Sequence, residues 1–154
     1  MLTVSFAMMG ELEANEIDDV LRSEFIGRIG CIVNGWPYVV PVTYAYDGEC
    51  AYAHSAEGLK LRAMRESPRV CFEVEQLRSM TNWRTVIAHG RFEELWSDAE
   101  ERAMDLIEAR LAGRETSASA LLAQWEDVHR REAVHRPVLF RIRLEDRTGR
   151  FELR

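Results

Sequence analysis

The sequence predicts a mainly β domain, in which six antiparallel strands form a small barrel with helices at its flanks. Hairpin signals support this class, because Asn34-Gly35 and Asp47-Gly48 separate runs of β-forming residues and such pairs tolerate the positive φ angles of tight turns. Closure of the strands into a barrel would leave no exposed sheet edge. The chain has 154 residues, 47% of them hydrophobic, which suits one domain spanning 1–154 with a substantial core.

The first half of the chain is predicted to contain one short helix and a three-stranded meander. The helix begins at Asn15, a good N-cap residue that is followed by acidic residues in the first turn. Three strands follow at 28–33, 36–46 and 49–55. Pro41 lies inside the second strand and cannot donate a ladder hydrogen bond, so this strand should lie at a sheet edge, be bulged or be interrupted.

The second half is predicted to alternate helices with the remaining strands. Ser67-Pro68 stops a short helix, and a capping box in Ser97-Asp98-Ala99-Glu100 starts a longer one. A long strand is expected to bend at Gly90. The predicted elements are, in order, a helix at 59–66, strands at 69–74 and 82–95, a helix at 97–111, a loop at 112–119, a helical stretch at 120–129 and a strand at 137–145.

The net charge of −6 argues against a nucleic-acid surface, because binding to a phosphate backbone relies on clustered positive charge. The nearest approach to a basic cluster is Arg130, Arg131 and Arg136, which is interleaved with His129 and Glu132. A mixed, solvated helix face is the simpler interpretation of that segment.

Cys31, Cys50 and Cys71 are scattered and form no CxxC pair, so the sequence indicates neither a disulfide framework nor a zinc site. His129 and His135 have no metal-like spacing with carboxylates or cysteines, and no metal site is predicted. The apolar N-terminal run is too short to span a membrane, and no basic residue precedes it. We therefore expect reduced thiols packed in strands and a cytoplasmic protein without a membrane segment.

Lys60 is the only lysine beside nineteen arginines, and it lies where a strand is predicted to turn into a helix. The strand ends in small polar residues, Gly58 follows, and the first helical turn leaves backbone N–H groups free at the positive end of the helix. This arrangement is typical of an anion site, to which Lys60 adds a point charge. The alternative is a solvated lysine on a short surface helix, and this segment alone favours that alternative.

Three segments together resemble one known family. They are 27–46 (GRIGCIVNGWPYVVPVTYAY), 52–74 (YAHSAEGLKLRAMRESPRVCFEV) and 82–95 (NWRTVIAHGRFEEL). In this order and spacing they resemble the FMN-binding split-barrel proteins related to pyridoxamine 5′-phosphate oxidase, most closely the nitroimidazole-resistance-like branch. The resemblance extends from about Glu11 to Leu95, and 137–150 fits the closing strand of that family.

The resemblance implies a six-stranded antiparallel split β-barrel that forms a homodimer, with two FMN molecules bound in clefts between the subunits. No catalytic acid is required, because the flavin carries the chemistry of hydride or electron transfer. The implied cofactor contacts are Val40, Pro41, Val42, Thr43, His54, Ser55, Ala56, Gly58, Lys60, Leu61, Trp83, Arg84 and Thr85.

The residue types at these positions suit a flavin nucleotide. The backbone around Pro41 can meet the polar edge of the isoalloxazine ring, while neighbouring valines cover its face. Gly58 permits close approach of the phosphate, and Lys60 neutralises part of the phosphate charge. Arg84 can add two charge-assisted hydrogen bonds to the phosphate. Thr85, on the other face of the strand, can donate a hydroxyl bond to the same group.

Other positions have two interpretations each. His54 is either a hydrogen-bonded structural residue or a contact of the phosphate, the ribityl chain or the substrate. Trp83 suits packing in the core or the dimer interface better than stacking on the flavin. Arg28 can pair with the phosphate or with an acidic interface residue, whereas His89 and Arg91 look like solvent-facing strand residues.

The predicted function is FMN-dependent reduction of a small-molecule electron acceptor such as a nitroaromatic or a quinone, with electrons from NAD(P)H or a partner protein. The segment 146–154 lacks the arginine- and histidine-bearing substrate motif of true pyridoxamine 5′-phosphate oxidases, which argues against pyridoxamine phosphate as substrate. Three alternatives stay open, because fold analogy cannot separate them. They are a deazaflavin-dependent reductase, a haem-binding split barrel, and a flavin-storage or sensing protein without turnover.

Overall fold

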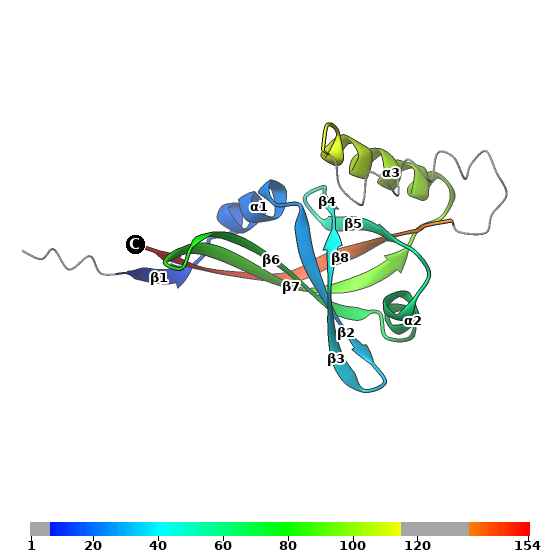
Figure 1. Cartoon of the computed structure of the whole chain (residues 1–154), viewed down its shortest axis with the longest axis horizontal. Coiled ribbons are helices and arrows are strands. Elements are labelled where there is room, and N and C mark those ends of the chain that lie inside the picture. The colour runs from blue at the N-terminus through cyan, green and yellow to red at the C-terminus, as the bar shows by residue number, and fades with distance from the viewer. Residues whose placement is uncertain (1–6, 115–135) are drawn as a thin grey trace, which may run out of the picture.

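The computed structural model describes residues 7–114 and 136–154 (Figure 1). Those ranges contain eight strands and three helices. The strands are β1 (Met8–Glu11), β2 (Ile26–Val33), β3 (Trp36–Thr43), β4 (Ala45–Tyr46), β5 (Cys50–Ser55), β6 (Arg69–Ser79), β7 (Asn82–Glu94) and β8 (Val138–Leu153), and the helices are α1 (Ala14–Ser23), α2 (Leu59–Glu66) and α3 (Ser97–Leu111).

All eight strands belong to one antiparallel sheet in the order β3-β2-β6-β7-β8-β5-β4, with β1 paired to β8 off this path. The two ends of the order, β3 and β4, are consecutive in the chain and are separated only by Tyr44. The sheet therefore curls back toward its own first strand, as in an open split barrel. Figure 1 shows α1 and α3 along the upper side of the sheet and α2 beside the β2–β3 hairpin. The predicted class, an antiparallel split barrel with flanking helices, is confirmed.

The six predicted strands all occur, but the sheet is larger than predicted. The strand expected at 36–46 is divided into β3 and β4, and β6 and β8 continue to Ser79 and Leu153. The additional strand β1 pairs with the far end of β8, with Met8 opposite Leu153. The count rises from six to eight because one predicted strand is divided in two and because β1 is added.

Two predictions about irregular positions in the strands are confirmed. β3 is an edge strand that pairs only with β2, and its Pro41 lies opposite Arg28. The register of the β7–β8 pair shifts between Ala88 and Gly90. A Cβ atom on Gly90 would lie 2.5 Å from Ile142 Cγ2, so this glycine is required for close strand packing.

Two hydrophobic cores hold the fold together. The main core fills the curled sheet and includes the fully buried Ile29, Leu61, Phe72 and Phe140. A second core lies under α3, where helix residues pack on strand residues including Leu139. Burial of apolar area at about 25 cal/mol per Å² drives both.

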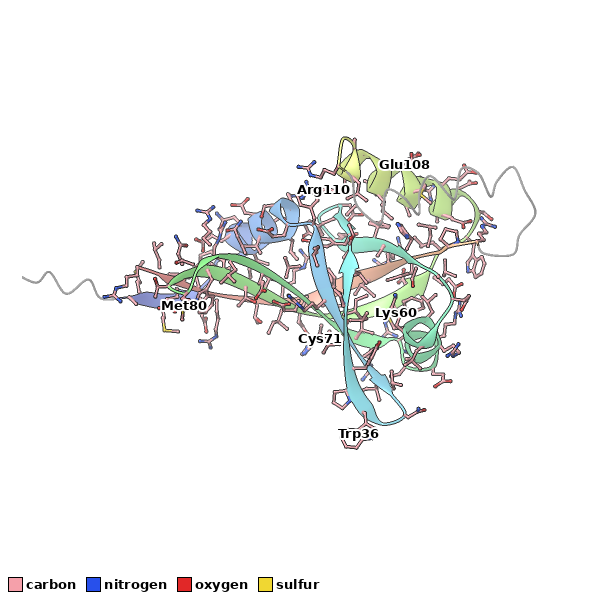
Figure 2. All side chains as sticks on the ribbon, in the orientation of Figure 1. Trp36, Lys60, Cys71, Met80, Glu108 and Arg110 are labelled. Carbon is pink, nitrogen blue, oxygen red and sulfur yellow. The ribbon has the colours of Figure 1, made fainter. Side chains whose placement is uncertain are left out.

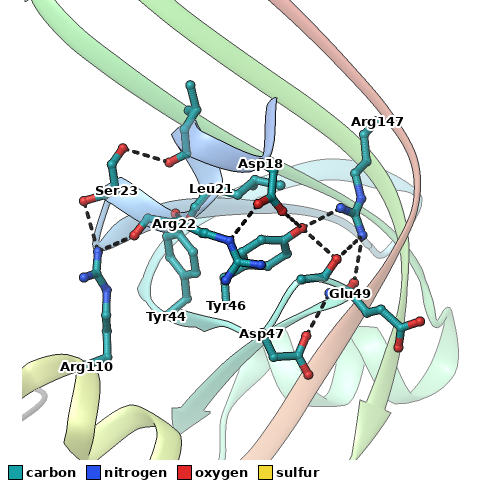
Figure 3. A network of polar contacts seen from close by, with 12 residues as sticks. Asp18, Leu21, Arg22, Ser23, Tyr44, Tyr46, Asp47, Glu49, Arg110 and Arg147 are labelled. Carbon is teal, nitrogen blue, oxygen red and sulfur yellow. Dashed lines mark hydrogen bonds and ion pairs between the residues drawn. The ribbon is translucent and has the colours of Figure 1, made fainter. Parts of the chain in front are cut away.

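Polar contacts connect α1 to β4 and α3 (Figure 3). The Tyr44 hydroxyl donates to the Leu21 carbonyl oxygen at 2.7 Å, and the Tyr46 hydroxyl donates to Asp18 Oδ1 at 2.9 Å. Arg110 donates to backbone carbonyls at the end of α1. These bonds fix α1 across the open side of the barrel and satisfy carbonyls that the helix leaves free.

Both predicted helix starts need correction. The N-cap of α1 is Glu13, not Asn15, and its capping box is closed by Glu16. The capping box expected from Ser97 to Glu100 does not form, and Trp96 occupies the N-cap of α3. Glu100 is buried and pairs with Arg136 at the start of β8, so a tertiary ion pair replaces the local cap.

Some predictions lie outside the described residues. These are the helical stretch at 120–129, most of the loop at 112–119, and the interpretations of His129, Arg130, Arg131 and His135. Within 7–114 and 136–154, no helix has the length and apolar content needed to cross a membrane.

Candidate functional site

Lys60 lies in the first turn of α2, beside free backbone donors. Gly58 is the N-cap and has no side chain to cap the helix. The first backbone hydrogen bond of the helix runs from the Arg62 N–H to the Gly58 carbonyl oxygen, at 3.2 Å. The N–H groups before Arg62 have no acceptor within the helix. Lys60 is half-buried, and burial lowers the pKa of its ammonium group. Among the described residues, none forms an ion pair or hydrogen bond with this ammonium.

His54 lies on β5 within electrostatic reach of Lys60. Its Nδ1 atom is buried and has no hydrogen-bond partner in the part of the chain that the structure describes. Burial, and then the charge of Lys60, lower the pKa of His54. Buried polar atoms in native proteins nearly always have a partner, so an unpartnered Nδ1 in a position closed to solvent is unusual. The interpretation of His54 as a hydrogen-bonded structural residue finds no support at Nδ1.

The loop between His54 and Lys60 leaves room beside the backbone. A Cβ atom on Gly58 would approach only the Ala56 carbonyl oxygen, at 4.0 Å, and φ of Gly58 is 173°, an extended value open to any residue. The glycine is therefore required neither by packing nor by backbone conformation within this chain. Ser55 is buried, and its hydroxyl donates to the Ala56 carbonyl oxygen at 2.8 Å, so it is already bonded locally.

The predicted β3 contacts lie partly in the core. Val42 is buried and Val40 packs against the main core, whereas Pro41 is exposed on the opposite face and Thr43 is half-buried. Leu61 is fully buried, so it can offer a ligand only its backbone N–H. Of these residues, only Pro41 has an exposed side chain, and the side chains of Val42 and Leu61 are closed to a ligand.

Cys31 is an addition that sequence reasoning did not include in the site. It lies on β2, against which α2 packs, and Lys60 is close enough to influence the pKa of its thiol. Burial raises the pKa of the Cys31 thiol, and Lys60 opposes this effect. All three cysteines are free thiols in strands, as predicted, and the described residues contain no cluster that could hold a metal ion.

Trp83, Arg84 and Thr85 lie at the other end of the sheet, each with a side-chain partner. Trp83 Nε1 donates to Glu152 at 3.1 Å, and Arg84 Nε donates to Gln76 at 2.9 Å. The Thr85 hydroxyl donates to the Glu73 carboxylate at 3.3 Å. The same carboxylate accepts a hydrogen bond from Arg28 at 3.2 Å. Bonds to Gln76 and Glu73 place Arg84 and Thr85 on opposite faces of β7, as predicted.

A single chain does not bring these two groups of residues together. His54 pairs with Leu139 near the start of β8, and Arg84 pairs with Phe151 near its end. The intervening strand is roughly 40 Å long at about 3.3 Å per residue. Figure 2 shows Lys60 beside α2, right of the centre, and Met80, at the tip of the β6–β7 hairpin, far to the left. We call the surroundings of His54, Gly58 and Lys60 the cradle, and Trp83 to Thr85 the distal group.

Arg28 makes intrachain ion pairs with Glu73 at 3.2 Å and Glu75 at 3.5 Å. Arg28 therefore has acidic partners, but these belong to its own chain and not to a subunit interface. His89 and Arg91 are exposed, as predicted, and both line a cavity of about 590 Å³ on the outer face of the sheet.

The curled antiparallel sheet with its flanking helices defines the class as a split-barrel domain. Residues 13–151 match the family model described as pyridoxamine 5′-phosphate oxidase. The chain belongs to this family.

Three known proteins show the range of similarity. The chain is 32% identical to a FAD-binding protein of Mesorhizobium loti, with 97% of this chain and 100% of that chain covered and a TM-score of 0.73. A candidate 5-nitroimidazole antibiotic resistance protein of Bacteroides thetaiotaomicron has the same fold, with a TM-score of 0.71, 17% identity, and coverage of 97% and 91%. An uncharacterized protein of Rhizobium meliloti is 32% identical over 84 residues, which is 54% of this chain and only 56% of the relative's length.

Proposed function

We propose that this protein binds FMN in clefts between two copies of the chain and uses it to reduce a small electrophile. The observation that carries the proposal is the cradle. Lys60 is a half-buried cation without a carboxylate partner among the described residues, and the buried Nδ1 of His54 lacks a partner there. The free ammonium group of Lys60 fits a phosphate dianion, which would accept hydrogen bonds from Lys60 and from the free N–H groups of α2.

The space beside Gly58 supports the same assignment. Its Cα faces open volume, since a Cβ there would contact only the Ala56 carbonyl oxygen at 4.0 Å. A phosphate can therefore come close to the backbone at the start of α2. The likeness to a FAD-binding relative at 32% identity supports a flavin as the group that carries this phosphate.

The distance between the cradle and the distal group supports a homodimer. A flavin mononucleotide is far shorter than the β8 segment that separates Lys60 from Arg84, so one molecule can contact both only when the distal group belongs to a second copy. Exposed apolar side chains on the β2–β3 hairpin, among them Trp36 and Val39 at 77% and 63% exposure, offer a surface for such pairing. Figure 2 shows Trp36 at the tip of this hairpin.

FMN, when bound, supplies hydride or electron transfer. The residues of the chain bind and orient it: Lys60 and the α2 N–H groups hold the phosphate, and the β3 backbone around Pro41 meets the ring. NAD(P)H or a partner protein would be the electron donor, and a nitroaromatic or quinone the acceptor. Pyridoxamine phosphate is a poor candidate, since residues 146–154 lack the arginine- and histidine-bearing substrate motif of true pyridoxamine 5′-phosphate oxidases.

Absorbance spectroscopy tests the cofactor assignment. The purified protein would be incubated separately with FMN, FAD, a deazaflavin cofactor and haem, freed of unbound ligand, and scanned. The expected result is retention of about one FMN per chain. Retention of only one of the other compounds would identify that compound as the cofactor. NAD(P)H oxidation with nitroaromatic or quinone acceptors then separates an enzyme from a flavin-binding protein without turnover.

A further inference from the structure

Arg65, in the last turn of α2, binds two carboxylates at once. Its NH1 and NH2 groups donate to the two oxygens of Glu57, at 2.9 and 2.7 Å. Its Nε and NH2 groups donate to the two oxygens of Glu94, at 2.7 and 2.9 Å. Glu57 immediately precedes Gly58, and Glu94 is the last residue of β7. One side chain therefore ties the loop that forms the cradle to the adjacent strand.

Glu57 is a potential competitor for the cradle. It lies three residues before Lys60, next to the positive end of α2, where a carboxylate is attracted by the free N–H groups and by the ammonium group. A carboxylate in that position would occupy the donors that a phosphate needs and would repel the dianion. In the structure both Glu57 oxygens are bonded to Arg65 instead. Lys60 is left without a carboxylate among the described residues.

We propose that Arg65 determines the selectivity of the cradle for phosphorylated flavin, by holding Glu57 away from Lys60. This inference rests on the proposed function, because it needs a phosphate-bearing ligand in the cradle. Arg65 is a positioning residue in this role, since its own guanidinium is bonded to the two glutamates and acts on the ligand only through Glu57. Glu94, at 14% side-chain exposure, anchors the arrangement to the sheet.

The test compares FMN with riboflavin, which lacks the phosphate. Dissociation constants for both would be measured by flavin fluorescence on the full chain, for wild type, Arg65→Met, Glu57→Gln and the double variant. Arg65→Met should weaken FMN by roughly tenfold, the scale of one carboxylate placed near a phosphate in a partly solvated site, and leave riboflavin within about twofold. Added Glu57→Gln should restore FMN binding, because the released carboxylate is then neutral. Arg22→Met, which removes a surface arginine paired with Asp18 at 2.7 Å on α1, is the matched control and should change neither ligand.

The outcomes separate this inference from the function on which it rests. Wild-type protein that binds neither ligand would overturn both. Wild-type protein that binds FMN, with equal losses of FMN and riboflavin in Arg65→Met or no rescue by Glu57→Gln, would overturn the role of Arg65 alone. If Arg65→Met does not fold, Arg65→Lys and Glu57→Gln give the answer. The lysine variant should bind FMN with intermediate affinity, and Glu57→Gln at least as tightly as wild type, so weaker FMN binding by Glu57→Gln would also refute the inference.

Discussion

Replacement of Lys60 by methionine tests the cradle most directly, because it removes the charge and keeps an unbranched side chain. A charge-assisted hydrogen bond from Lys60 to a phosphate is worth about 1.5–3 kcal/mol, which corresponds to a roughly 10- to 100-fold rise in the dissociation constant for FMN. The substitution breaks no existing ion pair, because no described residue pairs with Lys60, so the loss of affinity measures the contact with FMN. Riboflavin should bind the variant as well as it binds wild type, within about twofold.

The free protein provides an internal check on that substitution. Burial lowers the pKa of Lys60 in the folded state, so the unfolded chain holds this proton more tightly and the charged side chain costs stability at neutral pH. Lys60→Met should therefore unfold at the same or a higher urea concentration than wild type, in the absence of ligand. Fluorescence titrations with FMN and riboflavin and urea melts complete the experiment. Equal losses for both flavins would refute the placement of the phosphate beside Lys60, and a destabilised free protein would refute the desolvation cost of its charge.

Three further changes test the site and the fold. Gly58→Ala should leave the melting temperature within about 2 °C and weaken FMN several-fold, because the new Cβ contacts only one carbonyl oxygen at 4.0 Å in the free chain; unaltered FMN binding in a titration would place the phosphate elsewhere. Burial and Lys60 lower the pKa of His54 in the folded chain. Below the usual histidine pKa of 6.5, the unfolded chain therefore binds a proton at His54 more readily than the folded chain does. Stability should thus fall from pH 6.5 toward 5 in thermal melts of wild type and fall less in His54→Gln; parallel curves would contradict this. Gly149→Ala should cost about 1–3 kcal/mol in urea unfolding, because its Cβ would lie 2.7 Å from Leu12 and 3.0 Å from Ile17, and an unchanged midpoint would argue against that packing.

Local turn chemistry made the central strands predictable. Asn34 and Gly35 have φ values of 50° and 79°, the positive angles for which this pair was interpreted as a tight hairpin. Asp47 accepts hydrogen bonds from the backbone N–H groups of Glu49 and Cys50 at 2.8 and 2.7 Å, which fixes the second turn. Each of these turns is determined by residues that are neighbours in the sequence, so both hairpins could be predicted from the sequence alone.

The ends of the sheet and the helix starts depend on residues far apart in the chain. Met8 lies opposite Leu153, and neither terminal segment has a strong alternating pattern that would identify it as a strand. Glu100 fits a capping box by sequence, but its carboxylate is buried and pairs instead with the exposed Arg136. Asn15 is not the N-cap because Glu13 and Glu16 close a capping box that starts two residues earlier than expected.

The candidate site depends partly on local sequence and partly on tertiary packing. Gly58 and Lys60 share one helix start, so the sequence places them together, although that segment alone favoured a solvated lysine over an anion site. The sequence cannot show that Glu94 meets Arg65, since tertiary packing of α2 against the end of β7 brings them together. Nor can it show that Arg84 lies far from Lys60 within one chain, because the resemblance assigns contacts without saying which copy supplies them.

The separation of Lys60 and Arg84 has a consequence for genetics. In a dimer that builds each cleft from the cradle of one copy and the distal group of the other, a Lys60→Ala copy paired with an Arg84→Ala copy forms one cleft with both residues intact and one with neither. Homodimers of either variant contain only damaged clefts. Two individually defective alleles expressed in the same cell should therefore complement each other, with at most one working site per mixed dimer.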